Sequence, residues 1–277
     1  MKVGALLVSL LVFSTLAFAS QLQVTSPAEQ TLVVQEDVLD LGVIGPGQTL
    51  EIIAERASGV IAKDSQTKGE ALWDKLTVVR ETLPLGWKTE DSKLYENPFR
   101  AFVTTSPTAL DGEYSFQLRA MDQYEGVLEK TFNAKVLVSK DLLETSVSPS
   151  SLTTGVGLPA VFNVKLKNKS SASDVFQINA SGVPGEWKET RRVFVPFHSE
   201  VEVHYEVLAN EQGEFKLSIR TVSLSSDLIS SKQDVTLVTQ SSLVEDLKSL
   251  KRGLLLFPTA EQAVYSALGL IAQLIFG

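Results

Sequence analysis

The chain carries the same pattern of residues twice, and this internal repeat limits the folds that it can adopt more than any other feature. Trp87 recurs as Trp187, at an offset of 100 positions (187 minus 87). Further along, the segment Gly112–Phe116 matches Gly213–Leu217 in its glycine, acidic and apolar positions, at an offset of 101 (213 minus 112). Such a steady offset predicts that one structural unit of about 110 residues is built twice in succession.

Within each copy, apolar and polar residues alternate along short segments. In the second copy, for example, Phe162, Val164 and Leu166 alternate with Asn163 and Lys165. Because successive side chains of a β-strand point to opposite faces, this alternation predicts strands with one buried face. Clusters of Gly, Pro, Ser and Asn separate the segments, which is typical of a sandwich and not of a βαβ fold. We therefore predict an all-β fold with two tandem immunoglobulin-like β-sandwich domains.

The repeat also gives the expected domain boundaries. We expect the first domain at residues 20–142 and the second at residues 143–240, with a linker-like run near Ser146–Ser151. Upstream of the repeated tryptophan, the first copy is longer by about ten residues, which predicts a loop insert near residues 58–73.

The N-terminal segment is typical of an export signal. Lys2 precedes an apolar run that ends near Phe18, and the small residues Ala17 and Ala19 suit signal peptidase. We expect residues 1–19 to be a signal peptide and the mature chain to be extracytoplasmic. An uncleaved N-terminal anchor is the alternative.

Residues 241–277 change from strand-like to helical spacing, and we expect a helical tail. A short amphipathic segment is followed by an almost wholly apolar run that ends near Phe276. This run predicts a transmembrane anchor, with candidate membrane residues at Leu254, Leu268, Ile271 and Ile275. The basic residues precede the run, which is the wrong side for a single span with external domains. A helix at the membrane surface or on a partner, and packing on the protein itself, therefore stay open as alternatives.

The composition excludes several classes of function. The chain has 33 acidic residues against 25 basic ones, a formal net charge of −8. We expect no nucleic acid partner, because phosphate recognition needs clustered Lys and Arg. The chain has no cysteine, so disulfides, thiolate metal sites and thiol catalysis are excluded.

No motif for catalysis or cofactor binding appears in the sequence. The two histidines, His198 and His204, are expected at the surface, and the carboxylate clusters lack the spacing of a calcium loop. We therefore expect no catalytic residue, no cofactor and no metal site. A hydrolase, with two carboxylates or a Ser–His pair meeting in a pocket, is the least favoured hypothesis.

Five segments of the two copies carry a resemblance to a known family. They are DLGVIGPGQTLEI (Asp40–Ile52), LPLGWK (Leu83–Lys88), DGEYSFQLRA (Asp111–Ala120), VFNVKLKNKS (Val161–Ser170) and QGEFKLSIR (Gln212–Arg220). These segments resemble the CARDB-like and α-galactosidase-associated Ig-like repeats of archaeal and bacterial surface proteins. The resemblance implies a sandwich fold on an extracytoplasmic protein that serves as a spacer, adhesion unit or accessory module, and it supplies no catalytic residues. The insert and Trp73 depart from the pattern, which leaves the strand order of the first copy open.

These observations favour a non-enzymatic protein that is tethered by its C-terminal helix and contacts another surface protein, with the insert Ser58–Trp73 as the expected contact. We expect the tryptophan of each copy to fill the core of its sandwich or to cover it. A glycan-binding module is the alternative, with Trp73, Trp87 or Trp187 exposed as stacking platforms. Asn168 and Asn179 each lie in a sequon and are candidate glycosylation sites.

Overall fold

The computed structural model describes residues 20–62, 69–123, 129–183 and 189–241. The expected signal peptide, Trp187 and the candidate anchor residues Leu254, Leu268, Ile271 and Ile275 lie outside these ranges. Within the described residues, no helix is long and apolar enough to cross a membrane.

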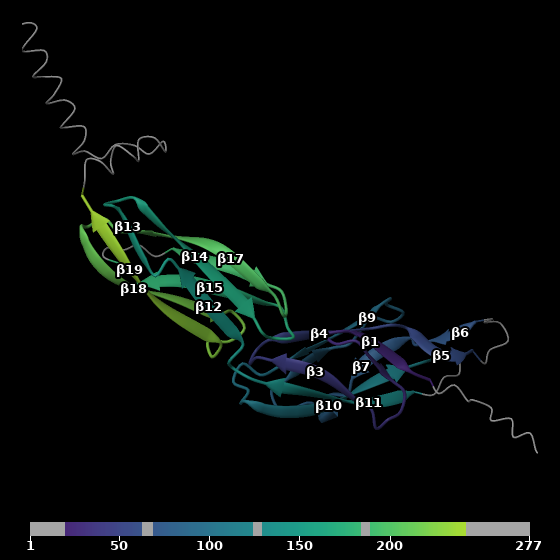
Figure 1. The fold of residues 1–277 in the computed structure, drawn as a ribbon. Coiled ribbons are helices and arrows are strands. Elements are labelled where there is room, and N and C mark those ends of the chain that lie inside the picture. Colours follow the sequence, from purple (N-terminus) through teal and green to yellow (C-terminus); the bar gives the residue numbers. More distant parts are fainter. Residues whose placement is uncertain (1–19, 63–68, 124–128, 184–188, 242–277) are drawn as a thin grey trace, which may run out of the picture.

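The first domain is a sandwich of two sheets, with a short hairpin at one end (Figure 1). One sheet has the order β2 (Gln30–Leu32), β1 (Leu22–Ser26), β4 (Thr49–Ala54), β9 (Phe99–Thr104) and β8 (Lys88–Glu90). The other has the order β3 (Val38–Ile44), β11 (Lys130–Val138), β10 (Gly112–Met121) and β7 (Lys75–Val78). The hairpin consists of β5 (Ala57–Ile61) and β6 (Glu70–Leu72), and a 3-10 turn, η1 (Arg80–Thr82), follows β7.

The second domain is also a sandwich of two sheets. The smaller sheet has the order β12 (Leu143–Ser148), β14 (Pro159–Asn168) and β17 (Glu200–Leu208). The larger has the order β13 (Ser151–Gly155), β19 (Ser230–Gln240), β18 (Gly213–Ser223), β15 (Asp174–Ser181) and β16 (Thr190–Val195). The prediction of an all-β fold with two tandem sandwiches is confirmed for the described residues.

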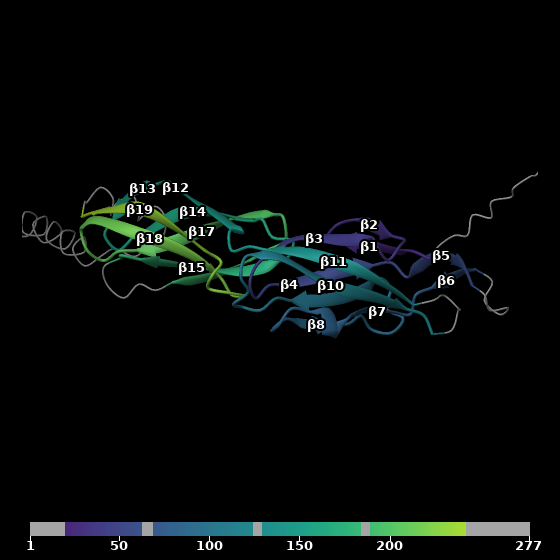
Figure 2. The same cartoon turned by 90° about the horizontal axis from the view of Figure 1, so that it is seen from below.

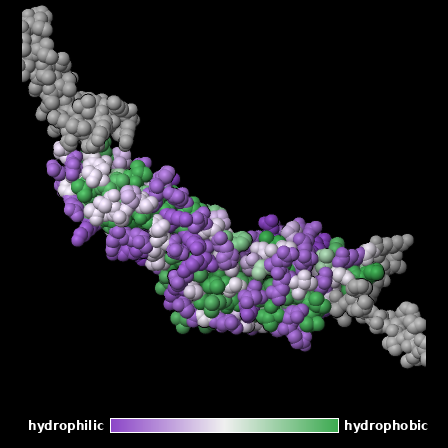
Figure 3. Space-filling view, viewed as in Figure 1, coloured by the Kyte–Doolittle hydropathy of each residue, from purple (hydrophilic) through white to green (hydrophobic). Residues whose placement is uncertain are grey.

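Each domain has a core of its own, formed by the inward-facing residues of its strands. Phe162, Val164 and Leu166 on β14 are fully buried, whereas Lys165 between them is exposed, as the alternation predicts. The visible face in Figure 3 accordingly mixes hydrophilic and hydrophobic residues over both domains.

The repeat corresponds to equivalent strands in the two domains. The two segments that match at an offset of 101 begin β10 and β18, and each of these strands pairs with the strand that follows it. In each domain the last strand also pairs in parallel with an early strand, β3 in the first and β13 in the second. The Ser-rich run Ser146–Ser151, expected as a linker, instead ends β12 and begins β13. Its composition was misleading, because Ser is also common in exposed strands and turns.

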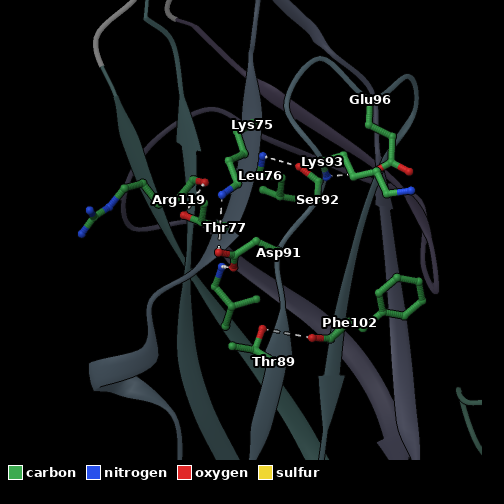
Figure 4. Close-up of polar contacts among 11 residues, drawn as sticks. Lys75, Leu76, Thr77, Thr89, Asp91, Ser92, Lys93, Glu96, Phe102 and Arg119 are labelled. Carbon is green, nitrogen blue, oxygen red and sulfur yellow. Dashed lines mark hydrogen bonds and ion pairs between the residues drawn. The ribbon is translucent and has the colours of Figure 1, made fainter.

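The two domains differ in the strand that follows β7 in the first domain and β15 in the second. In the first domain, β8 pairs with β9 and leaves the edge of β7 without a neighbouring strand. The segment that contains Asp91 and Ser92 covers this edge instead. The Leu76 N–H donates to Ser92 Oγ (2.9 Å; Figure 4), and the Val78 N–H donates to Asp91 Oδ1 (3.0 Å). In the second domain, β16 pairs with β15 and becomes the edge of that sheet.

The domains lie end to end and form an elongated molecule in both views (Figures 1 and 2). The start of β1 and the end of β19 lie towards opposite ends of the molecule. The β5–β6 hairpin occupies the end of the first domain that points away from the second domain, which we call the distal end.

Candidate functional site

The first candidate site is the joint between the two domains, where turns of both domains meet. The β3–β4 turn packs against the β14–β15 turn, since the Ser171 N–H donates to the Val43 carbonyl (2.7 Å) and the Val43 N–H donates to Ser171 Oγ (3.2 Å). The hydrophobic cores also interlock. Ala172 of the second domain belongs to the core of the first, and Val43 packs against the core of the second.

A buried polar network crosses the joint at Gln48 and Asp174. Gln48 Nε2 donates to Asp174 Oδ2 at 2.6 Å, and both side chains are buried. The same carboxylate accepts hydrogen bonds from Ser223 Oγ (2.6 Å) and Ser225 Oγ (2.9 Å). On the other side, Gln48 Oε1 accepts a hydrogen bond from Ser170 Oγ (2.7 Å). A carboxylate with this number of donors keeps its charge solvated by protein groups, so it can stay buried at the joint.

The close fit of the joint depends on glycine. Gly47 has a φ of +71°, and a Cβ atom at this position would collide with the Ser225 carbonyl oxygen. At Gly45, a Cβ atom would collide with the Ile229 side chain. Any other residue at Gly47 would therefore meet both an unfavourable backbone conformation and a backbone atom of the other domain.

Trp73 and Trp87 are core residues and do not offer the stacking platforms of the glycan-binding alternative. Trp73 is fully buried and its Nε1 donates to the Gln21 carbonyl (2.7 Å). Trp87 is only 9% exposed and packs against Tyr114 and Phe116, with ring centroids 5.3 and 6.4 Å away. The alternative that Trp73 and Trp87 stack on glycans is therefore wrong, because core side chains cover their indole faces. Trp187 lies outside the described residues.

The two candidate glycosylation sites differ in accessibility. Asn168 is 1% exposed, and its Nδ2 donates to the carbonyl groups of Ala172 (2.8 Å), Pro196 (3.2 Å) and Val195 (3.3 Å). The prediction of glycosylation at Asn168 is wrong for the folded chain, because this amide nitrogen holds three backbone carbonyls together beside the joint. Asn179 is half-buried and accepts a hydrogen bond from Thr190 Oγ1 (2.8 Å), and its modification stays a prediction.

The second candidate site is the distal end of the first domain. The hairpin within the predicted insert is attached firmly at its base, where Ser58 Oγ donates to the Ala71 carbonyl. Arg56 lies 3.6 Å from the Asp74 carboxylate, and its Nε donates to the Trp73 carbonyl (2.9 Å). These contacts fix the base of the hairpin on the sandwich.

Tyr95 is the most distinctive side chain of the distal end. It has a φ of 61°, a backbone conformation that costs free energy in residues other than glycine. The Arg56 guanidinium lies over its ring, 5.6 Å from the centroid. Tyr95 is nevertheless 46% exposed, and Ile61 on the hairpin is 83% exposed. The distal end thus presents an aromatic and an aliphatic side chain on a fixed backbone.

The buried and half-buried ionisable groups serve structure. Lys130 Nζ donates to the carbonyl groups of Ser20 and Val33, and burial lowers the pKa of Lys130. Burial also raises the pKa of Tyr205, whose hydroxyl donates to the Glu189 carbonyl (2.7 Å) and accepts a hydrogen bond from the Ala180 N–H (2.9 Å). These bonds tie segments of each domain together.

The histidines do not form a catalytic arrangement. His198 Nε2 lies 3.4 Å from Ser171 Oγ at the joint, and His204 Nδ1 lies 2.7 Å from Asn163 Oδ1. Among the described residues, neither histidine bonds to a carboxylate, and no group of three His, Cys, Asp or Glu residues could hold a metal ion. A Ser–His contact without an orienting acid lacks the third member of a nucleophilic triad.

Comparisons with known proteins give similarity at the level of the fold. No family model matches the chain, and no curated protein matches it. Among solved structures, fibronectin(III)-like modules of Clostridium thermocellum CbhA are 14% identical with a TM-score of 0.28, covering 79% of this chain and 94% of that chain. A chimeric titin Z1Z2 structure is 15% identical with a TM-score of 0.34, covering 81% of this chain and 99% of that chain.

A β-glucosidase from Listeria innocua, solved with glucose, is also similar, at 17% identity and a TM-score of 0.26. The match covers 36% of this chain and only 16% of the enzyme. Because all these TM-scores are low, the assignment to tandem Ig-like sandwiches rests on the strand order described above. The resemblance to CARDB-like repeats stays a prediction.

Proposed function

We propose that the chain is a non-enzymatic, exported spacer and binding protein. In this proposal it is a stiff arm of two domains, tethered at the cell membrane through its C-terminal tail, and its distal end contacts another surface protein. The observation that carries the proposal is the hydrogen bond between Gln48 and Asp174, which joins the two domains inside a buried network.

The network supports stiffness because bending at the joint would break it. Neighbouring domains in one chain move relative to each other unless their interface is well packed. Here a bend would separate Gln48 from Asp174 and expose a carboxylate and an amide that lose their partners. Because water would replace the lost partners, the loss is the net contribution of a hydrogen bond to a charged group, about 1.5–3 kcal/mol, and the straight arrangement is favoured.

The placement of the ends supports the binding role of the distal end. The end of β19, which precedes the tail, lies towards the opposite end of the molecule from the β5–β6 hairpin (Figure 1). An arm attached through its tail would hold Tyr95 and Ile61 far from the membrane. Partly exposed tyrosine is well suited to partner contacts, since it buries a large apolar ring and keeps a polar hydroxyl.

Stiffness is tested by distances between spin labels in the full chain, reconstituted in a membrane mimic. The chain has no cysteine, so Glu113→Cys and Glu214→Cys give one label in each domain at equivalent exposed positions. The expected result is a single narrow distance distribution, which broadens in the Gln48→Ala variant. A broad distribution in the parent chain would overturn the proposal of a stiff arm.

Binding by the distal end is tested by isolating the full chain with its neighbours from cross-linked membranes. A recurrent surface protein is expected with the parent chain and with the control variant Val161→Ala, which alters an exposed apolar residue of the second domain. The double variant Tyr95→Ala and Ile61→Ala should lose it. Retention of the same neighbour by the double variant would show that the distal end is not the contact.

A further inference from the structure

The edge strand β16 carries an exposed aromatic residue where an edge would be expected to repel other strands. Phe194 is 60% exposed, although its neighbours Val193 and Val195 point into the core. Proteins commonly protect such an edge with charge or with a covering segment. The first domain covers β7, where Asp91 and Ser92 bond to the edge N–H groups (Figure 4). On β16 the protection is positive charge, from the exposed Arg191 and Arg192.

Phe194 belongs to an apolar row that runs across three strands. Val175 on β15 pairs directly with Phe194. On its other side, the Val175 carbonyl accepts a hydrogen bond from the Leu224 N–H (2.9 Å), which extends the β15–β18 pairing by one residue. Directly opposed residues of neighbouring strands point to the same face, so Phe194, Val175 and Leu224 form a continuous stripe. Leu224 is also exposed at the surface.

The next rows of the same face contain basic residues. Arg192 pairs with Gln177, which lies opposite Val222, and two residues further along the sheet Arg220 pairs with Lys232. Arg192 and Arg220 are exposed, and among the described residues neither forms an ion pair. The lysines of the other sheet, by contrast, pair with glutamates, as Lys165 does with Glu200 at 2.8 Å. The exposed charges of β16 itself are therefore positive, on a chain whose net charge is −8.

We infer that β16 and the Phe194 face bind an extended acidic segment of a partner protein, which adds as a further strand to the edge of the sheet. Its backbone would pair with β16, its apolar residues would cover Phe194, and its carboxylates would lie beside Arg192. Arg220, on β18 two strands further into the sheet, would add to the positive charge of this face. Backbone pairing gives affinity to strand addition, and the alternate side chains give specificity.

The charges select this occupant over a second copy of the chain. Pairing of β16 with β16 of another copy would bring Arg191 and Arg192 of both copies into one short ladder. Like charges that face each other across a ladder are destabilising. An acidic strand replaces this repulsion with attraction, and its encounter is steered by charge.

The test uses the full chain in a membrane mimic and a short synthetic peptide that alternates glutamate and valine. We expect saturable binding that weakens with added salt, and slower hydrogen exchange in β16 when the peptide is bound. The same peptide with lysine in place of glutamate should not bind. Phe194→Ala and Arg192→Glu should each weaken binding by about tenfold.

Two variants control for general effects of these substitutions. Val161→Ala shortens an exposed apolar residue on the other sheet, and Arg80→Glu reverses an exposed charge in the first domain. Both should bind the peptide like the parent chain.

Four outcomes would overturn the inference: no binding of the glutamate peptide, binding that the β16 variants leave unchanged, self-association of the parent chain that Phe194→Ala abolishes, or preference for an anionic polysaccharide such as heparin over the peptide. The inference concerns β16 of the second domain and depends neither on the contact at the distal end nor on the stiffness of the arm. The cross-linking result and the spin-label distances would therefore stand whatever the peptide shows.

Discussion

The contribution of the Gln48–Asp174 hydrogen bond to the free energy of unfolding can be measured. Asp174→Ala removes the acceptor of three side-chain hydrogen bonds, at 2.6, 2.6 and 2.9 Å. Two of the donors, on Gln48 and Ser223, lie in buried side chains, and each buried donor without a partner costs about 1–3 kcal/mol. Ser225 is closer to the surface and can turn to water. We expect Asp174→Ala to lower the free energy of unfolding by about 3–5 kcal/mol.

A double-mutant cycle separates the bond across the joint from the effects within each domain. Gln48→Ala and Asp174→Ala are made singly and together, and the free energy of unfolding of each full chain is measured by urea denaturation. Hydrogen bonds to charged groups contribute about 1.5–3 kcal/mol, so we expect a coupling energy of that size. The surface pair Lys165 and Glu200, whose side chains are 47% and 52% exposed, is the control and should give under about 1 kcal/mol.

Additivity within about 0.5 kcal/mol, in which the losses of the two single variants sum to the loss of the double variant, would contradict coupling across the joint. Gln48 and Asp174 would then contribute independently, and the network would not couple the domains. Unfolding in two separate steps, with only one step shifted by either substitution, would lead to the same conclusion.

Three further predictions follow from single positions. Gly47→Ala should broaden the spin-label distance distribution and lower the midpoint of urea denaturation, because a Cβ atom collides with the Ser225 carbonyl; a variant with parent-like values in both measurements would contradict the close fit. Trp87→Ala should lower the free energy of unfolding, measured by urea denaturation, by about 3–5 kcal/mol, because the indole packs in the core. An unchanged free energy of unfolding, together with lost binding to immobilised glycans, would contradict this structural role. The folded chain raises the pKa of Tyr205 through burial, so it holds the phenolic proton more tightly than the unfolded chain does. The contribution of this group to the free energy of unfolding is present below about pH 10 and is lost as the pH rises further. Urea denaturation from about pH 9 to 11 should therefore show a smaller decline of the free energy of unfolding in Tyr205→Phe than in the parent chain. An identical decline in both proteins would contradict this prediction.

The strands and cores were accessible from the sequence because their signals are local. Alternation such as that of Phe162, Val164 and Leu166 follows from strand geometry alone, and the repeat offset shows that the plan recurs. The sequence did not show that β8 pairs with β9 in the first domain whereas β16 pairs with β15 in the second. β8 and β16 join different sheets, and that choice depends on packing against neighbours far along the chain.

The candidate sites were less accessible, because identical residue types have different roles when buried. Trp73 and Trp87 could be core residues or platforms in the sequence, and only their burial decided between these roles. Asn168 fits a sequon, yet its amide serves three carbonyls inside the fold. Phe194 belongs to a segment that alternates like any strand, and the sequence does not show which face of that strand is exposed. Its exposure follows from the pairing of β16 with β15.

Two all-β domains can be predicted from the order of the amino acids, since hydrophobic alternation acts between residues close together in the chain. How the domains meet depends on contacts between residues far apart in the chain. Gln48 and Asp174 are 126 positions apart, and neither lies in a motif that predicts a partner. Their bond forms because the glycine-containing β3–β4 turn approaches serine-containing turns of the second domain closely enough to bury both side chains. Such a fit depends on the packing of the whole fold.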